Sequence, residues 1–325
     1  MRKGFLCLVL SSAMLAGMGF LSPTATLAVY PEKPVTLLVG FAPGGAQDMA
    51  ARAMTEAVKK HFPKPLVMVN RPGAAGTISV SEVLRSKPDG YTIGITTAAI
   101  LIIQPLRTKL PYTSPEDFTL IIKVVSNPNL IAVNSTAPWK TIQEFIAYAQ
   151  SNPGKVRVSI PGIGNELHLC VEQLKRMAKA DFTSVPFSGS GEGLPAMIGG
   201  HVEAISTHPN SVVGHGNAGK IRVLLFFGEK RSPLFPDGPC SKELGYDIIM
   251  AVTSFFIGPK GIPPQIVSIL HDALKKGMED PIFEKPIKAQ GFEISYMAPE
   301  DLKKHLMKEY EEYAKLVELL DLKGK

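Results

Sequence analysis

The sequence lacks the short motifs that identify most catalytic sites. The glycine-rich segment at residues 161–165 is followed by Leu167 where a dinucleotide-binding fingerprint needs its third glycine. The segment FSGSG around Ser190 lacks the first glycine of a nucleophile elbow. Histidines recur every seven residues between positions 201 and 215, but no HExxH motif or cysteine cluster accompanies them. These absences argue against an enzyme, and they predict neither a cofactor nor a metal ion.

Cysteine is scarce, with three residues in a chain of 325. Cys7 lies too close to the start to be a lipid-attachment cysteine. Cys170 is expected in a helix and Cys240 in a proline-rich loop, and in an oxidising compartment the two thiols can pair. The alternative, which we favour, is two inert thiols in largely apolar surroundings.

Clusters of one charge are missing as well. The formal net charge is +6, and the Lys and Arg residues are spread along the expected helices instead of being gathered in a block with aromatic residues. A solvated surface is therefore expected, which at most slightly favours the approach of acidic solutes. No nucleic-acid partner is predicted.

Only the start of the chain has a long hydrophobic run. Two basic residues precede an apolar stretch at residues 5–21, and small residues lead to Ala28. This order is typical of an export signal, so residues 1–28 are predicted to be a signal peptide that is cleaved after Ala28. A retained membrane anchor is the alternative, but no charged stop-transfer sequence follows and Pro23 interrupts the end of the run. The mature chain is expected to be soluble.

One pattern, an apolar strand, a charge-poor glycine loop and an amphipathic helix, occurs twice. The first copy occupies residues 35–62 with the loop APGGAQD, and the second occupies residues 155–179 with the loop PGIGN. The start of a helix carries unpaired N–H groups and a partial positive charge of roughly half an elementary charge. Each copy therefore predicts an anion-binding loop, and two copies suggest two lobes that face a single small anion.

Strand and helix patterns alternate along the rest of the chain. Strands are expected at residues 65–70, 91–96 and 130–134 and in a second series after position 154. A third set begins near Ala251 and ends in a helix at residues 299–320. The alternation predicts a mainly parallel sheet with helices on both faces. Because no long Gly/Ser linker lies near positions 128 and 250, hinge motion is favoured over independent domains.

A series of motifs resembles one family of transport receptors. In chain order the motifs are YPEKPVTLLVGFAPGGAQDMAAR, VNRPGAAG, KPDGYTIGITT, LPYTSPEDFT, NPGKVRVSIPGIGNELHL, VPFSGSG, GGHVEA and AGKIRVL. Together they resemble the periplasmic solute receptors of tripartite tricarboxylate transporters, also called the Bug family. The match runs from Tyr30 to about Pro264 and continues more loosely to the C-terminus. Any one motif alone is weak, whereas the set is highly specific.

The resemblance implies an α/β protein with the type II periplasmic-binding-protein fold, in which a ligand cleft separates two α/β lobes. Residues 29–128 and 250–325 are expected in the first lobe and residues 129–249 in the second. The implied function is a periplasmic receptor that captures a small carboxylate and is recognised, in its closed form, by the membrane subunits of a tripartite transporter. A monomer without a cofactor is expected. The alternatives are a periplasmic sensor or accessory protein that binds the same solute class for signalling, and a periplasmic enzyme.

In the first lobe the resemblance places the ligand against two loops. Family ligands are held mostly by loop amides, hydroxyls and ordered waters, so Arg71 in the NRPG motif is expected to be structural. Asp48 either supports the start of a helix or accepts a hydrogen bond from a ligand amine. The candidate residues are Gly44, Gly45, Ala46, Gln47, Asp48, Ala74 and Ala75, with Thr97 and Ala98 lining the same wall.

In the second lobe the glycine-rich loop is followed by departures from the family pattern. Asn165 replaces the usual hydroxyl residue, and its amide can still donate a hydrogen bond. Thr207 and His208 stand where the family has an Asp-Asn pair, which is expected to change selectivity. His168 is either a core histidine or a ligand contact. The candidate residues are Gly162, Gly164, Asn165, His168, Ser188, Gly189, Ser190, Thr207 and His208.

Overall fold

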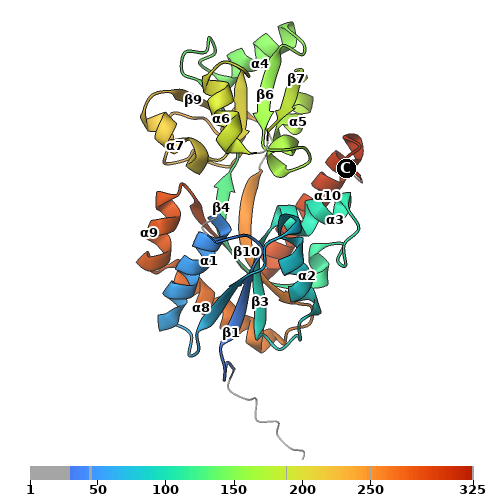
Figure 1. Cartoon of the computed structure of the whole chain (residues 1–325), viewed down its shortest axis with the longest axis vertical. Helices are drawn as coiled ribbons and strands as arrows, with labels where there is room; N and C mark the ends of the chain where they lie inside the picture. The colour runs from blue at the N-terminus through green and yellow to red at the C-terminus, as the bar shows by residue number, and fades with distance from the viewer. Residues whose placement is uncertain (1–29, 44–45, 188, 247, 249, 324–325) are drawn as a thin grey trace, which may run out of the picture. The chain divides into compact units, whose positions relative to one another are not determined.

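Two β-sheets flanked by helices organise the chain (Figure 1). The computed structural model describes residues 30–43, 46–187, 189–246, 248 and 250–323. The predicted signal peptide, residues 1–28, therefore lies outside the described residues. Within the part that is described, no helix combines the length and the apolar character that a membrane span requires.

The first sheet has six strands among the described residues, in the order β11-β4-β10-β3-β1-β2. They are β1 (Val35–Val39), β2 (Leu66–Asn70), β3 (Thr92–Thr97), β4 (Phe118–Pro128), β10 (Ala251–Pro259) and β11 (Glu293–Met297). The central strands are runs of β-branched and aromatic residues that are buried on both faces, as expected for a sheet covered by helices on two sides. β2 is an edge strand, and only Leu66 of it is buried.

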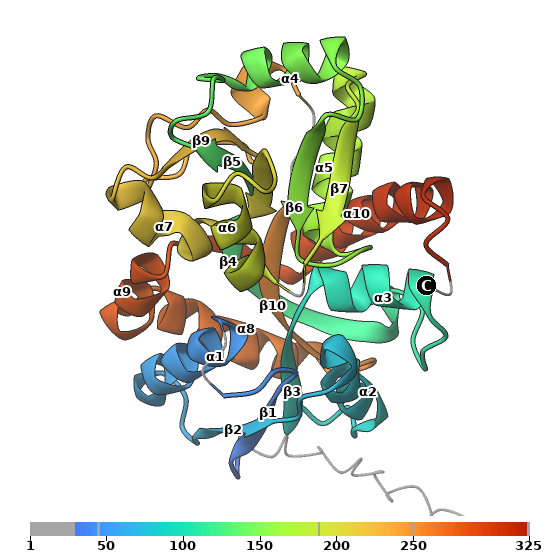
Figure 2. The same cartoon turned by 45° about the horizontal axis from the view of Figure 1, so that its top comes forward.

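Helices cover both faces of the first sheet (Figures 1 and 2). One group consists of α1 (Ala46–Ala57), η1 (Val58–Lys60), α8 (Pro264–Met278) and α9 (Pro281–Ala289), which contact one another. The second group consists of η2 (Ala74–Gly76), α2 (Thr77–Arg85), η3 (Ala99–Ile103), α3 (Gln104–Arg107), η4 (Pro115–Asp117) and α10 (Pro299–Leu319). Proline at the start of α8, α9 and α10 suits the first helical turn, where no N–H donor is needed.

The second sheet has five strands among the described residues, in the order β7-β6-β8-β5-β9. They are β5 (Leu130–Asn134), β6 (Val156–Ile160), β7 (Phe182–Pro186), β8 (Ala204–Thr207) and β9 (Ile221–Phe226). Its helices are α4 (Ile142–Ser151), α5 (Glu166–Ala178), α6 (Ser190–Ile198), α7 (Pro209–Asn217) and η5 (Lys242–Leu244). The apolar residues of α4 and α5 belong to one hydrophobic cluster and those of α6 and α7 to another, so the two helix pairs cover opposite faces.

The prediction of a mainly parallel sheet is wrong, because both sheets are mixed. β1 is parallel to β2 and β3, and β6 is parallel to β7 and β8. β10 is antiparallel to β3 and β4, and β5 is antiparallel to β8 and β9. The physical reason is the crossing of the chain between the sheets. The long strand β4 leaves the first sheet and β10 returns to it beside β4, and strands that leave and return side by side must be antiparallel.

Asn129 holds the crossing point together. It lies between β4 and β5 and is fully buried. Its N–H donates to the carbonyl of Met250 at 3.2 Å, and its own carbonyl accepts from the N–H of Phe227 at 2.8 Å. Its side-chain amide nitrogen lies 2.9 Å from the sulfur of Cys170. Cys170 and Cys240 are both free and buried, so no disulfide joins them.

A continuous hydrophobic cluster links the elements of the two sheets. It contains Ile257 of β10 and Leu306 of α10 together with Leu169 of α5 and Phe182 of β7. Full burial of one such side chain contributes about 1.5 to 3 kcal/mol. The sheets are thus joined by shared packing as well as by the two crossing strands.

Candidate ligand-binding site

Gln47 is the buried polar residue of the first candidate loop. Gly44 and Gly45 lie outside the described residues, and α1 begins at Ala46, immediately after them. The Gln47 side chain is 7% exposed, and neither its Oε1 nor its Nε2 has a hydrogen-bond partner among the described residues. A buried amide without partners costs about 1 to 3 kcal/mol, so this position is suited to a polar guest.

Asp48 is held by two neighbouring side chains in the first turn of α1. Its carboxylate accepts a hydrogen bond from Asn70 Nδ2 at 2.8 Å and from Arg52 Nε at 2.8 Å. The hydrogen bond to Asp48 raises the pKa of Arg52, so the guanidinium stays ionised. Asn70 Nδ2 also donates to the carbonyl of Phe41, which ties the start of the loop to β2. Arg52 compensates the negative charge of Asp48, and this lessens its repulsion of an anionic guest.

Ala74 and Ala75 have a left-handed backbone. Their φ angles are 44° and 52°, a region that costs an L-residue roughly 1 to 2 kcal/mol. Such strain is concentrated at functional sites more often than elsewhere. Arg71, just before this loop, forms an ion pair with Glu82 at 3.1 Å. Thr97 ends β3 and is 9% exposed, and Ala98 is buried beside it.

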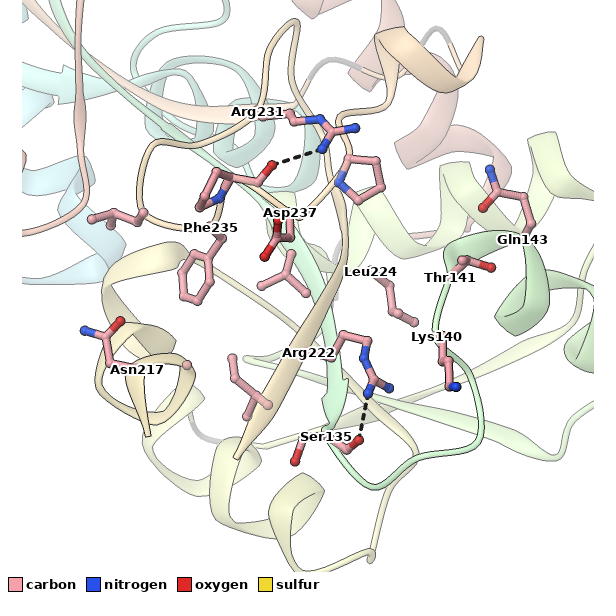
Figure 3. Close-up of a pocket in the computed structure, with 17 residues that line it drawn as sticks. Ser135, Lys140, Thr141, Gln143, Asn217, Arg222, Leu224, Arg231, Phe235 and Asp237 are labelled. Atoms are coloured by element: carbon pink, nitrogen blue, oxygen red, sulfur yellow. Dashed lines mark hydrogen bonds between the residues drawn. The ribbon is translucent and has the colours of Figure 1, made fainter. Parts of the chain in front are cut away.

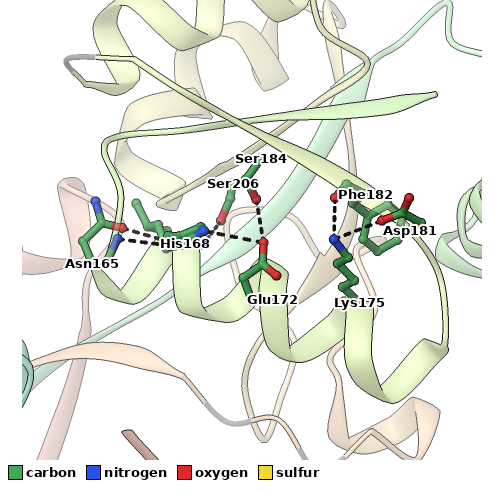
Figure 4. A network of polar contacts seen from close by, with 10 residues as sticks. Asn165, His168, Glu172, Lys175, Asp181, Phe182, Ser184 and Ser206 are labelled. Carbon is green, nitrogen blue, oxygen red and sulfur yellow. Dashed lines mark hydrogen bonds and ion pairs between the residues drawn. The ribbon is translucent and has the colours of Figure 1, made fainter. Parts of the chain in front are cut away.

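The loop from Gly162 to Gly164 leads from β6 into α5 (Figure 4). Both glycines have positive φ, 99° and 76°, which explains why this loop needs residues without a side chain. Asn165 is the N-cap of α5, and its Oδ1 accepts from the N–H of His168 at 2.9 Å. Its Nδ2 already donates to the carbonyl of Pro161 at 2.5 Å. Asn165 therefore shapes the loop, and a ligand must compete for its amide.

His168 is engaged at both ring nitrogens. Its Nδ1 accepts from the N–H of Gly164 at 3.0 Å, which places the ring proton on Nε2. Nε2 lies 3.5 Å from Oε1 of Glu172, and Ser184 Oγ donates to the same carboxylate at 3.0 Å. Burial alone raises the pKa of Glu172, but the hydrogen bonds from His168 and Ser184 lower it overall. This chain of contacts along α5 fixes the position of the Gly164 N–H.

The remaining candidates of the second lobe lie at the starts of α6 and α7. Ser188 lies outside the described residues, and Gly189 is the residue before α6. Ser190 Oγ lies 2.8 Å from Thr207 Oγ1, so the structure brings these two hydroxyls together. His208 precedes α7, and its buried Nδ1 has no hydrogen-bond partner among the described residues. Burial lowers the pKa of His208 to about 4, which keeps the imidazole neutral.

Arg107 is a residue that the sequence did not reveal. It ends α3 beside the first sheet, and its Nη1 donates to the carbonyl of Gly164 at 3.5 Å. A Cβ atom added to Gly164 would fall 2.7 Å from Arg107 Cζ. A second contact joins Asn127 Nδ2 of β4 to Asn210 Oδ1 of α7 at 3.4 Å. No sequence signal marks either contact, because both depend on how the chain crosses between the sheets.

A cavity of about 570 Å³ lies elsewhere, on the outer side of β9 (Figure 3). Its lining includes Arg222, which donates to the carbonyl oxygens of Ser135 and Trp139, and Arg231, which is paired with Glu243. None of the candidate residues lines this cavity. In the described part of the chain, no group of three or more His, Cys, Asp or Glu side chains is placed to hold a metal ion.

Comparisons with known proteins give one consistent result. Residues 50–322 match the family model described as "Tripartite tricarboxylate transporter family receptor". The chain is 33% identical over 298 residues to the "UPF0065 protein in gbd 5'region" of Cupriavidus necator, covering 91% of this chain and 90% of that one. It is 28% identical to Protein BugT of Bordetella pertussis, covering 94% and 96% of the two chains.

Solved structures of similar fold include both empty and ligand-bound proteins. A TctC solute binding protein from Polaromonas, solved without ligand, has a TM-score of 0.81 at 29% identity, covering 89% of this chain and 99% of that one. An R. palustris protein with adipate has a TM-score of 0.72 at 28% identity, with coverages of 89% and 97%. MatC from Rhodopseudomonas palustris with bound malate has a TM-score of 0.70 at 27% identity, with coverages of 89% and 100%.

Proposed function

The chain belongs to the tripartite tricarboxylate transporter family of receptors, the Bug family, and from this membership we propose that it captures a small carboxylate in the periplasm. The two-lobe fold is that of the periplasmic solute-binding proteins of this family. The first lobe comprises residues 29–128 and 250–325 and the second residues 129–249. The division of the strands between two sheets supports these bounds.

The orphaned amide of Gln47 is the observation that carries the site assignment. A carboxamide offers a donor and an acceptor, and both are buried at the end of the first loop without a partner among the residues that the structure describes. In an empty protein this arrangement is unfavourable, and a carboxylate that accepts from Nε2 satisfies the donor, while Oε1 needs a hydroxyl, an amine or a water. His208, from the second lobe, has an orphaned ring nitrogen as well.

Helix starts supply the attraction for a negative charge. Four helices of nine residues or more begin at candidate positions, namely α1 at Ala46, α5 after Asn165, α6 at Ser190 and α7 after His208. Each start directs free N–H groups and a partial positive charge at the ligand. A hydrogen bond to a carboxylate contributes about 1.5 to 3 kcal/mol, so a few of them account for micromolar affinity, about 8 kcal/mol.

The ligand class is supported by two similar structures. Adipate and malate, bound in the two R. palustris proteins, are both small dicarboxylates. The candidate loops of this chain have the charge-poor composition that suits main-chain recognition of such anions. Asn165, Thr207 and His208 set the selectivity within this class.

We also propose how the protein is exported and what it docks on. Residues 1–28 direct export and are removed near Ala28, and the mature receptor is a monomer that docks on the membrane subunits of a tripartite transporter when it is closed. Family members are receptors and not enzymes, which supports binding without turnover. A sensor that binds the same solute is the second candidate, and no observation favours it over the receptor.

We expect Gln47→Leu to weaken carboxylate binding about ten- to a hundredfold, the equivalent of one lost hydrogen bond to a charged group. The measurement is calorimetric titration of the mature chain, residues 29–325, with malate, adipate, citrate and acetate. The same substitution removes an unsatisfied buried amide, so the ligand-free variant should unfold at the same temperature or a higher one.

Gln143→Leu is the matched control. Gln143 is exposed and lines the cavity of Figure 3, so its replacement leaves carboxylate affinity unchanged if the ligand binds at Gln47. Equal affinity of the wild type and Gln47→Leu for every acid that binds would contradict the site. Failure of all four acids to bind would contradict the proposed function.

A further inference from the structure

A cavity of about 350 Å³ lies at the crossing between the two sheets, away from every candidate residue of the carboxylate site. Its walls come from β4, β11 and α10 of the first sheet and from residues 227–230, which follow β9 of the second sheet. The volume is within the range of about 300 to 1,000 Å³ that is usual for small-molecule sites. Two ionisable side chains reach it from positions that are more than nine-tenths buried.

Lys123 is the first of these side chains. It is 4% exposed in the middle of β4, yet it lines the cavity. Both neighbouring strands pair with Lys123 and Val125 and skip Val124, so β4 bulges at this point. A bulge redirects the side chains beside it and is frequent near binding sites. Lys123 forms no hydrogen bond or ion pair with any residue that the structure describes.

Glu309 is the second of these side chains. It lies on α10, is 7% exposed, and its Oε2 has no hydrogen-bond partner among the described residues. Its Oε1 lies 3.6 Å from Nε2 of His305, one turn earlier in the helix. Burial raises the pKa of Glu309 to about 8, although Lys123 acts to lower it. Burial lowers the pKa of His305 to about 4, so this imidazole is neutral.

The other charged groups around the cavity are already paired. Lys230 lies 3.7 Å from Glu293, Lys308 lies 3.8 Å from Glu312, and Glu229 lies 3.4 Å from Lys242. With these pairs satisfied, Lys123 and Glu309 are the groups that a guest can meet. They are a potential cation and a potential anion with a cavity beside both, and they form no ion pair with each other in the described residues. A buried charge is retained only where something polar compensates it.

We infer that this cavity is a second ligand site, which binds a small zwitterion such as a neutral α-amino acid. The carboxylate of the guest accepts hydrogen bonds from the ammonium of Lys123, and its ammonium donates to Oε2 of Glu309. This second site does not depend on the carboxylate site at Gln47.

A zwitterion fits these charges better than an anion or a cation does. The lining contains four carboxylates, Glu229, Glu293, Glu309 and Glu312, and three lysines, Lys123, Lys230 and Lys308. A simple anion meets this excess of carboxylates, and a simple cation meets the buried ammonium of Lys123. A zwitterion places each of its ends against the opposite charge.

The affinity should depend on pH with a definite sign. The guest ammonium needs Glu309 to be ionised, and the ligand-free protein holds a proton there until the pH reaches about 8. Burial also lowers the pKa of Lys123, and as long as this ammonium keeps its proton, affinity for a zwitterion rises by roughly an order of magnitude or more between pH 6 and pH 8. A site that bound a simple anion through Lys123 and protonated Glu309 would show the opposite trend. The groups that face Glu309 are Lys123 from β4, Glu293 from β11, Glu229 and Lys230 from the segment after β9, and His305, Lys308, Glu312 and Tyr313 from α10.

The experiment is calorimetric titration of the mature chain at pH 6, 7 and 8 with glycine, alanine, serine and proline. Propionate and ethylamine serve as probes that carry only one of the two charges. We expect at least one amino acid to bind, and Lys123→Met and Glu309→Gln each to weaken that binding about ten- to a hundredfold. Lys304→Met and Glu311→Gln change the same residue types on the exposed side of α10 and should leave it unchanged.

Gln47→Leu separates the two sites. It should weaken carboxylate binding and leave amino-acid binding as it was, while Lys123→Met should do the reverse. No binding by any of the four amino acids would overturn the second site, and so would binding that survives both Lys123→Met and Glu309→Gln. Propionate binding that equals alanine binding and is lost in Lys123→Met would replace the zwitterion with an anion. Both substitutions remove a buried ionisable group, so the variants are expected to fold.

Discussion

Neutral polar groups at the proposed carboxylate site lie beside a compensated Asp48 and beside Arg107, which contacts the Gly164 carbonyl. Within the described chain, both polar side-chain atoms of Gln47 and the Nδ1 of His208 have no hydrogen-bond partner, and the pKa of His208, about 4, keeps its ring uncharged at neutral pH. Asp48 is compensated by Arg52. His168 is committed to Gly164 and Glu172, and because its Nδ1 already accepts from the Gly164 N–H, its contribution is to hold the loop in shape. Buried ionisable side chains are found instead at the crossing between the sheets, at Lys123 and Glu309.

Glu309 gives the folded protein a characteristic response to pH. Its pKa rises from 4.5 to about 8 on folding, so the unfolded chain releases the proton first and stability is lost as the pH rises through this range. His208 and His305, whose pKa falls to about 4, have the opposite effect, but only below pH 6.5. Between pH 6.5 and 8 the free energy of unfolding should therefore fall by about 1 kcal/mol per pH unit.

Urea unfolding of the ligand-free mature chain at several pH values in this window checks the prediction. In Glu309→Gln the slope should disappear, whereas Glu311→Gln, on the exposed side of α10, should retain it. A wild-type stability that stays constant from pH 6.5 to 8 would show that Glu309 is not protonated in the folded state.

At the scale of elements, helix α6 lies close against strand β6, and a glycine allows this close approach. It begins at the candidate residues Gly189 and Ser190 and packs on β6 through Gly193. A Cβ atom at Gly193 would collide with Ser159 Oγ, so a side chain here would force the serine or the helix to shift. The position of the Ser190 hydroxyl beside Thr207 depends on this packing.

Gly193→Ala should destabilise the protein by about 1 to 3 kcal/mol, the usual effect of overpacking, and should also weaken carboxylate binding. Gly191→Ala is the control on the same helix. An added Cβ there meets no atom of the described residues within 4 Å, and alanine is the better helix former by about 1 kcal/mol, so stability should rise or stay level. Thermal unfolding of both variants tests this prediction, and equal melting temperatures would contradict the close packing of Gly193 against Ser159.

The elements that local sequence patterns define were predictable, and those that depend on the chain's path were not. The strand and helix on either side of the PGIGN loop are present, as are the strand after Ala251 and the long C-terminal helix. The strand β4 was not predicted, because its sequence FTLIIKVVSNP does not alternate between apolar and polar residues and contains Lys123. The mixed order of the sheets, the bulge at Val124 and the contact of Arg107 with Gly164 arise only from long-range pairing.

On the scale of the whole molecule, the proposed carboxylate site draws on groups from both sheets. β4 and β10 run side by side between the two sheets. At the crossing, Asn129 forms main-chain hydrogen bonds with Met250, just before β10, and with Phe227, just after β9. The contacts of Arg107 with Gly164 and of Asn127 with Asn210 connect residues on the two sides. A ligand that uses the starts of both α1 and α5 stabilises only the arrangement in which the two loops face each other.

A crystal structure of the mature protein with its tightest carboxylate tests this account most directly. The account predicts that the carboxylate lies between the start of α1 and the loop before α5, accepts hydrogen bonds mainly from main-chain N–H groups, and contacts the amide of Gln47. A carboxylate held chiefly by arginine or lysine side chains, Arg107 included, or one bound in the cavity beside β9, would contradict it.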